Sequence, residues 1–187
     1  MHKKKKSILL LSIGFSLLLL SFIILKTTNY PLSSQSMGVS ITNKYDTISE
    51  IENDSSIIVN ATVEGNESFI YKDVPFTISE LKVNEVYKGN VEKGNSINLL
   101  ETGGVIDNVE YTVETDTTLK RNEDAILFLT EYEGPILENT KKYVVSGVFQ
   151  GKFRMNEDNS IIPSEHNDGE LSEIRLVEDL NLEEINN

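Results

Sequence analysis

A run of 18 residues without a charged side chain, Ile8 to Leu25, follows four consecutive lysines, Lys3 to Lys6. A helix of that length spans about 27 Å, close to the roughly 30 Å hydrocarbon core of a bilayer. Lysines on the N-terminal side of such a run keep that end in the cytoplasm, so the rest of the chain is expected outside. The sequence therefore predicts a membrane segment, residues 1–26, and an extracytoplasmic body.

A cleaved signal peptide is the alternative to an anchor. The apolar region of a signal peptide is usually about 7–15 residues long, shorter than this run. The pattern of small residues that cleavage requires occurs only at Ser34-Gln35-Ser36, far beyond Leu25. We therefore favour a single-pass anchor, with a secreted body if the segment is cleaved. Residues 27–40, rich in Ser, Thr and Asn, are expected to form a flexible spacer before a domain spanning 41–187.

The body is strongly acidic, because the chain after residue 26 carries 12 Lys and Arg against 30 Asp and Glu, a net charge of −18. Such a surface repels phosphate backbones, so we expect no nucleic-acid partner. The chain has no Cys, which excludes disulfides, thiolate nucleophiles, iron–sulfur clusters and the Cys-linked lipid of a bacterial lipoprotein. Its only histidines are His2 and His166, so we predict neither a zinc site nor a Ser-His-Asp triad, and no cofactor.

The body reads as short β-branched runs separated by turn residues. Strands are expected over 56–63, 69–86, 96–101, 109–113, 125–132 and 143–155. Thr47 followed by Glu50 has the spacing of a capping box and predicts a helix over about 47–54. Apolar residues at helical spacing from Glu170 predict a terminal helix. Mainly β structure is therefore expected, as a small barrel of five to six strands with short flanking helices.

Three local features refine that expectation. Gly65-Asn66 predicts a turn, and the broken alternation between Ile78 and Leu81 predicts a bulge or bend in one long strand. Gly151 predicts a sharp bend within the strand over 143–155. Five consecutive apolar residues, 125–129, predict a central strand covered on both faces.

Several segments carry a resemblance to a known family: SSIIVNATV, LKVNEVYKGN, KGNSINLLETGG and NEDAILFLTEYEG. Their order resembles the OB-fold of netrin-like modules, including the tissue inhibitors of metalloproteinases, and is similar to uncharacterised exported proteins of bacilli and related Gram-positive bacteria. The resemblance implies an OB-like barrel over about residues 45–155. Netrin-like protease inhibitors chelate zinc through an N-terminal Cys, which this chain lacks, so that mechanism does not transfer.

Phe69 and Tyr71 are two residues apart on an expected strand, so their side chains share a face. In an OB barrel, the central strands and the loops beside them are the usual ligand surface. Aromatic side chains there stack on sugar rings or on a partner's side chains. We predict these two residues as the candidate ligand face; the alternative is that they pack the core or cover the barrel end.

Taken together, these features favour a noncatalytic binding or interaction module, anchored in the membrane and facing outward. Its expected partner is a protein or a cell-envelope ligand. One alternative is a protease inhibitor that inserts a loop into its target. A carboxylate-pair hydrolase is a further alternative, which requires two inward-facing carboxylates about 5–10 Å apart in a cleft.

Overall fold

The structure is a computed structural model that describes residues 16, 30–38 and 44–182. Apart from Ser16, the predicted membrane segment lies outside these residues, and so does the predicted domain boundary at residue 41. Within the described residues, no helix is both long enough and apolar enough to cross a bilayer.

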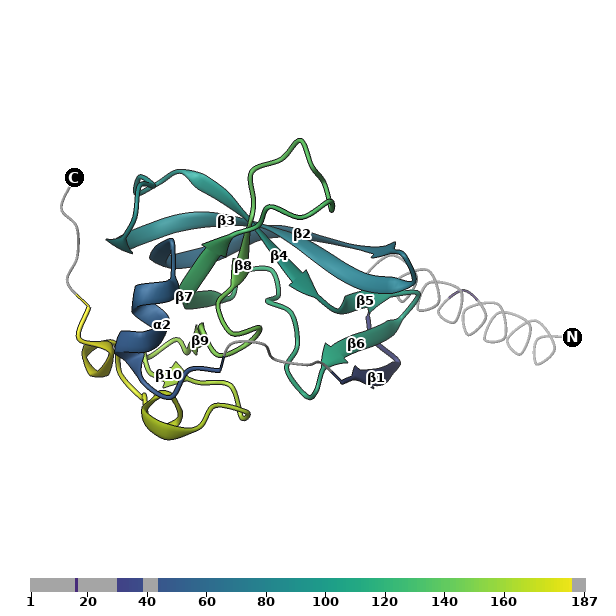
Figure 1. Cartoon of the computed structure of the whole chain (residues 1–187). Coiled ribbons are helices and arrows are strands. Elements are labelled where there is room, and N and C mark those ends of the chain that lie inside the picture. Colours follow the sequence, from purple (N-terminus) through teal and green to yellow (C-terminus); the bar gives the residue numbers. More distant parts are fainter. Residues whose placement is uncertain (1–15, 17–29, 39–43, 183–187) are drawn as a thin grey trace, which may run out of the picture.

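Five strands form a closed barrel (Figure 1): β2 (Ile57–Tyr71), β3 (Val74–Lys88), β4 (Ser96–Thr102), β7 (Asp124–Glu131) and β8 (Tyr143–Val145). The hydrogen-bonded order is β7-β2-β3-β4-β8, and β8 pairs back to β7. The β4–β8 pair is parallel, whereas the other barrel pairs are antiparallel. The predicted mainly β barrel is thus confirmed.

The backbone closes this barrel along only part of its length. β4 and β8 share the single pair Leu99–Tyr143. Only residues 129–131 of β7 pair with β8. Toward the N-terminal end of β7, residues 124–127 pair with β9 (Lys152–Met155) instead. β9 does not pair with β4, so a gap between these two strands remains on the side where β4 ends.

Both faces of β7 are buried, as predicted. Leu127 and Leu129 belong to the barrel interior, and Ile126 and Phe128 point outward. The outward pair is covered by α2 (Ile48–Asp54), β9, β10 (Ile161–Ile162) and the 3-10 helices η1 (Gly169–Ser172) and η2 (Val177–Leu180). We call these five elements the cover. The predicted capping box is present, with Glu50 N donating to Thr47 Oγ1 and Glu50 Oε2 accepting from Thr47 N.

A second sheet lies against the β2–β3 hairpin, in the order β1 (Ser33–Met37), β6 (Val109–Val113), β5 (Gly104–Ile106). β1 pairs in parallel with β6, so five residues of the predicted spacer form a strand against the body. β5 packs closely on the hairpin: a Cβ on Gly104 (φ +121°) would lie 2.0 Å from Thr77 Oγ1. Glycine is required there.

Two turn assignments from the sequence are wrong. β2 continues through Gly65-Asn66, and the chain reverses at Lys72-Asp73, both with positive φ (49° and 63°) as a two-residue hairpin turn requires. The register of β2 against β3 shifts between Val63 and Gly65. The irregularity predicted between Ile78 and Leu81 of β3 therefore lies in the partner strand, next to a glycine that tolerates it.

The segment 143–155 is not one bent strand, because β8 ends at Val145 and turns separate it from β9. Gly151 is needed for packing, since a Cβ there would lie 2.8 Å from Phe128 O. The predicted terminal helix is also wrong: η1 and η2 occupy that segment. Arg175 between them gives its carbonyl to Ile161 N and its N–H to Asp179 Oδ2, so an α-helical ladder cannot form.

Candidate functional site

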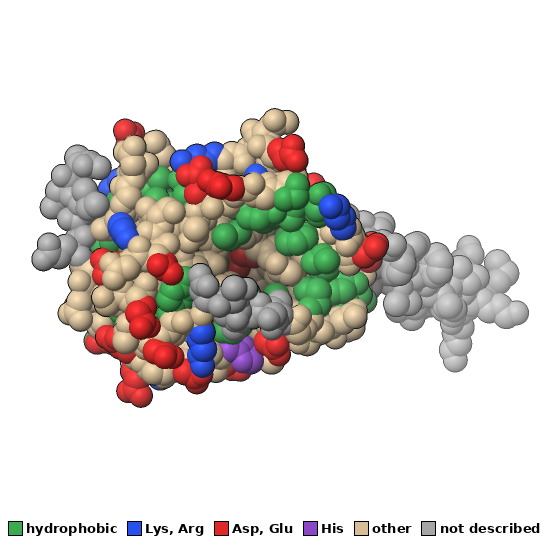
Figure 2. Space-filling view, in the orientation of Figure 1, with side chains coloured by type: hydrophobic (Ala, Val, Ile, Leu, Met, Phe, Trp, Pro, Cys, Tyr) green, Lys and Arg blue, Asp and Glu red, His purple; other side chains and the backbone are tan. Residues whose placement is uncertain are grey.

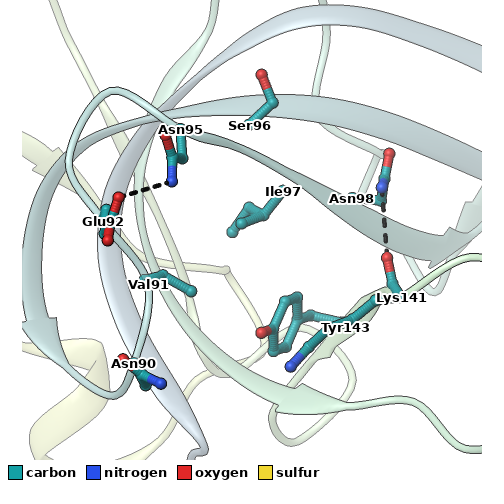
Figure 3. A pocket seen from close by; sticks show the side chains of 9 residues that line it. All are labelled: Asn90, Val91, Glu92, Asn95, Ser96, Ile97, Asn98, Lys141 and Tyr143. Carbon is teal, nitrogen blue, oxygen red and sulfur yellow. Dashed lines mark hydrogen bonds between the residues drawn. The ribbon is translucent and has the colours of Figure 1, made fainter.

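A pocket of about 470 Å³ opens at one mouth of the barrel, between the β3–β4 loop and the end of the β7–β8 loop. Figure 3 shows Val91, Ile97 and Tyr143 at its centre, with polar side chains around them. The apolar centre continues the barrel interior, because Ile97 and Tyr143 belong to the core and Val91 packs on it. The polar rim consists of Asn90, Glu92, Asn95, Ser96, Asn98 and Lys141.

Part of this rim is already engaged in hydrogen bonds. Asn95 donates to Glu92 Oε2 (3.2 Å), and Asn98 donates to the carbonyl of Lys141 (3.3 Å). The side chains of Asn90 and Ser96 have no hydrogen bond within the described part of the chain, and both are exposed. The rim therefore presents unpaired hydrogen-bond donors and unpaired hydrogen-bond acceptors to an incoming ligand.

Lys141 is the one cationic residue among those described that lines this pocket, and a neighbouring carboxylate balances its charge. Lys141 Nζ lies 3.1 Å from Glu131 Oε2 and 5.4 Å from the centroid of the Tyr143 ring. The hydrogen bond to Glu131 and then the phenol of Tyr143 raise the pKa of Lys141. With this pair balanced, Glu92 is the carboxylate left on the rim, where it acts as a hydrogen-bond acceptor. Amides and this acceptor around an apolar floor suit a neutral ligand rich in hydroxyl and amide groups.

The β7–β8 loop, residues 132–142, projects from the barrel beside this pocket (Figure 1). Lys142 is 2% exposed, and its ammonium donates to the carbonyls of Leu137 (2.6 Å) and Thr140 (2.9 Å). Ile136 is buried, whereas Leu137 is 43% exposed. The hydrogen bonds of Lys142 therefore hold the loop from inside, and the side chain of Leu137 is exposed on its surface. We call it the braced loop.

A network of buried charges spans the gap between β4 and β9. Lys152 Nζ donates to Glu101 Oε1 (2.8 Å) and to the carbonyl of Thr117 (2.7 Å), and it forms an ion pair with Asp116 Oδ2 (2.5 Å). The second oxygen of Glu101 accepts from Leu119 N (3.0 Å). Sequence analysis missed this network, because Glu101 and Lys152 are 51 residues apart and no pattern marks them.

Phe69 and Tyr71, the predicted ligand face, lie near the end of β2 at the hairpin turn and share a face as expected. Phe69 stacks on Phe76 with ring centroids 6.2 Å apart, and Lys72 Nζ lies 5.3 Å from the Tyr71 ring centroid. β4 runs from the pocket at Ser96 to Thr102, which pairs with Phe76. The structure therefore places the predicted face and the pocket at opposite ends of the barrel.

No group of three or more His, Asp or Glu in the described residues is arranged to hold a metal ion. His166 contacts a threonine and a phenylalanine. Its Nε2 lies 2.8 Å from Thr115 Oγ1, and its ring lies against that of Phe149. Glu157-Asp158-Asn159 forms the β9–β10 turn, where Asp158 accepts hydrogen bonds from Ser160.

No protein-family model matches this chain, and no curated protein matches it significantly. The resemblance to netrin-like modules thus remains a prediction from short motifs.

Proposed function

We propose that this chain is a noncatalytic binding module, anchored in the membrane with its body outside the cytoplasm, and that its barrel is OB-like. The strand order supports the fold: numbered along the chain, the barrel strands close as 1-2-3-5-4, with strands 3 and 5 parallel. A five-stranded barrel that its backbone closes only in part matches the OB-fold implied by the netrin-like resemblance. The lysine run and apolar segment in the sequence support the anchoring.

The pocket at the barrel mouth carries the binding proposal. It combines an apolar floor with unengaged polar groups at Asn90 and Ser96, beside the loop that joins the fourth and fifth barrel strands. In OB barrels that loop flanks the ligand surface. A neutral, hydroxyl-rich and amide-rich ligand of the cell envelope, such as a glycan, matches this chemistry.

The buried carboxylates favour binding over hydrolysis. Glu101 and Asp116 face one cation, Lys152, and Asp116 also accepts from Arg154 (3.2 Å). A carboxylate-pair hydrolase needs one carboxyl group that holds a proton for the leaving group. Two carboxylates that accept hydrogen bonds from cations are suited to an ion network, so we assign them a structural role.

Binding is tested with detergent-solubilised full-length protein and soluble fragments of cell-wall glycan. We expect the Asn90→Ala/Ser96→Ala double variant to lose affinity by about tenfold or more, since each lost hydrogen bond contributes on the order of 1 kcal/mol. Asn53→Ala, an exposed asparagine on α2, is the matched control. Equal affinity of the double variant and the control for these fragments would reject the pocket as the binding site.

Anchoring is tested separately by adding protease to wall-stripped intact cells. We expect digestion of the body without permeabilisation of the membrane. Survival of the body until the membrane is opened would overturn the proposed topology.

A loop-inserting protease inhibitor is the second candidate, favoured by the braced β7–β8 loop with exposed Leu137. An inhibitory loop must resist distortion in a protease cleft, and the Lys142 bonds supply that rigidity. If this function is correct, Leu137→Asp abolishes inhibition of the target protease and leaves glycan binding intact. A panel of extracellular proteases that the full-length protein does not inhibit would exclude it.

A further inference from the structure

Exposed hydrophobic side chains gather at one end of the molecule. Eight large hydrophobic residues among those described are exposed, and four of them lie there: Tyr30 (63%), Leu32 (70%), Ile70 (58%) and Val74 (38%). We call these four residues the tip surface. Figure 2 shows hydrophobic side chains concentrated toward this end on the face in view.

The tip surface is assembled from two segments that are far apart in the sequence. Ile70 and Val74 flank the β2–β3 turn. The segment from Tyr30 to Leu32 is fixed to the β5–β6 turn, because Asn108 Nδ2 donates to Tyr30 O (2.8 Å) and Leu32 N donates to Asn108 O (2.7 Å). Tyr30 lines a pocket with Ser68, which is two residues from Ile70. Figure 1 shows the β2–β3 turn, β5, β6 and β1 at one end and α2, β9 and β10 at the other.

Apolar side chains lie on both faces of the β2–β3 hairpin, beside its Lys72-Asp73 turn. Ile70 lies on the face that contacts β5, and Tyr71 pairs with Val74 on the opposite face. A protein partner that docks on one side would leave the other side in water. A lipid interface surrounds an inserted turn on both sides, so it covers all of these groups at once.

The chain brings this end close to the predicted membrane. The apolar run ends at Leu25, five residues before Tyr30. Fully extended, that stretch reaches at most about 18 Å. Ser68 and Ile70 are separated by about 7 Å along the strand. The tip surface is therefore the described apolar surface that lies nearest in the chain to the membrane segment.

From this arrangement we propose that the tip surface rests in the lipid interface of the membrane that anchors the chain. The inference rests on the proposed anchoring. Tyr71 and Lys72 have the chemistry of an interfacial pair: an aromatic ring with a polar end, and a cation 5.3 Å from its centroid that reaches lipid phosphates. The strongly acidic remainder of the body is held off the surface by its charge.

This docking fixes the orientation of the barrel. Phe69, the other residue of the predicted ligand face, lies just behind the turn, whereas the pocket lined by Asn90 and Ser96 lies at the far end of the barrel. With the tip surface in the interface, that pocket points away from the membrane and toward the cell wall.

The chain has no Trp, so a single introduced Trp reports on its own surroundings. Full-length Ile70→Trp is reconstituted into vesicles of phosphatidylglycerol and phosphatidylethanolamine, with and without brominated acyl chains. Ile162→Trp is the matched control, since Ile162 is 49% exposed in β10, within the cover at the other end. Flotation of the vesicles shows whether the protein stays attached.

We expect the emission of Ile70→Trp to shift to shorter wavelength and to be quenched by the brominated lipid, while Ile162→Trp emits as a water-exposed Trp. If the protein floats but both variants emit alike, the inference is wrong and the anchoring stands. If the protein does not float, the anchoring fails and the inference fails with it. A shift that needs high protein density and is not quenched by brominated lipid assigns the tip surface to contacts between copies, which also overturns the inference.

Discussion

Two halves of one barrel are built from the same strands by different chemistry. In the half that we call the apolar half, the interior is filled by Leu81, Leu99 and Leu127, all fully buried. In the polar half, toward the β2–β3 turn, β3 and β4 point Thr77, Ser79 and Glu101 inward, and these are buried too. The first half is closed by backbone pairing of β4, β8 and β7. The second is bridged by Lys152 and its carboxylates.

The difference shows that strand alternation and hydrophobic alternation are separate signals. β3 keeps a period of two between Thr77 and Val83, but its inward side changes from Leu81 and Val83 to Thr77 and Ser79. Phe76 and Ile78 then face outward. The break in the sequence pattern between Ile78 and Leu81 therefore marks the point where the apolar side chains of β3 change face, opposite the register shift in β2.

The largest expected effect concerns the packing around the apolar half. Phe128 is fully buried, and its ring centroid lies 5.6 Å from that of Phe153 in the cover. Phe128→Ala should cost about 3–5 kcal/mol of unfolding free energy. Glu157→Ala, in the exposed β9–β10 turn, should change it by less than about 0.5 kcal/mol. Urea melts measure both, and a Phe128→Ala protein that melts like the parent contradicts this account of β7.

The next effect tests the polar half. Lys152→Met leaves Glu101 buried without its cation, and we expect a loss of about 3–5 kcal/mol, as for other broken buried ion pairs. The double variant Lys152→Met/Glu101→Met removes the orphan charge, while Asp116 keeps Arg154. It should be more stable than the single variant in urea melts. Equal stability of the single variant and the parent would mean that the bridge contributes nothing to closing the barrel.

Prediction from sequence succeeded where one segment carried its own signal. Five apolar residues in a row identified β7 as covered on both faces, and the Thr47 capping box identified α2. It failed where distant segments meet. The pocket at the barrel mouth needs the loops near Asn90 and Lys141 to converge, which happens only after β4 and β8 pair. The polar half needs Glu101 to turn inward, and an isolated Glu in a strand is ordinarily expected in water.

A smaller effect concerns the cover. Thr47→Ala removes the side-chain oxygen that caps the N-terminus of α2. A lost N-cap costs about 1 kcal/mol, well below the Phe128 effect, because Ile48 and Ile51 still pack on β7. Thr140→Ala, an exposed threonine of the β7–β8 loop, is the control. If Thr47→Ala and Thr140→Ala give the same urea midpoint, the cap contributes nothing to the stability of the cover.

Acid should loosen the cover, because two of its carboxylates accept hydrogen bonds from the backbone. The pKa of Glu50 is lowered by hydrogen bonds from the backbone of Asp46 and Thr47, and that of Asp179 by the backbone of Arg175 and Leu176. Both residues lie in the cover. Groups with a lowered folded pKa stabilise the protein above their unfolded values, here 4.5 and 3.8. That stabilisation is lost as the pH falls below these unfolded values and through the lower folded ones.

Amide hydrogen exchange at pH 6 and pH 3, corrected for intrinsic rates, measures this. Protection in α2 and η2 should fall more than protection in residues 125–129 of β7, which carry no carboxyl group. Glu50→Gln should reduce the pH dependence in α2, because a neutral side chain has no carboxylate charge to lose. Asp168 gives a second check, since its pKa is lowered by Lys44, which ties η1 to the start of α2. A uniform loss of protection across the barrel and the cover would show that the two respond to acid as one unit.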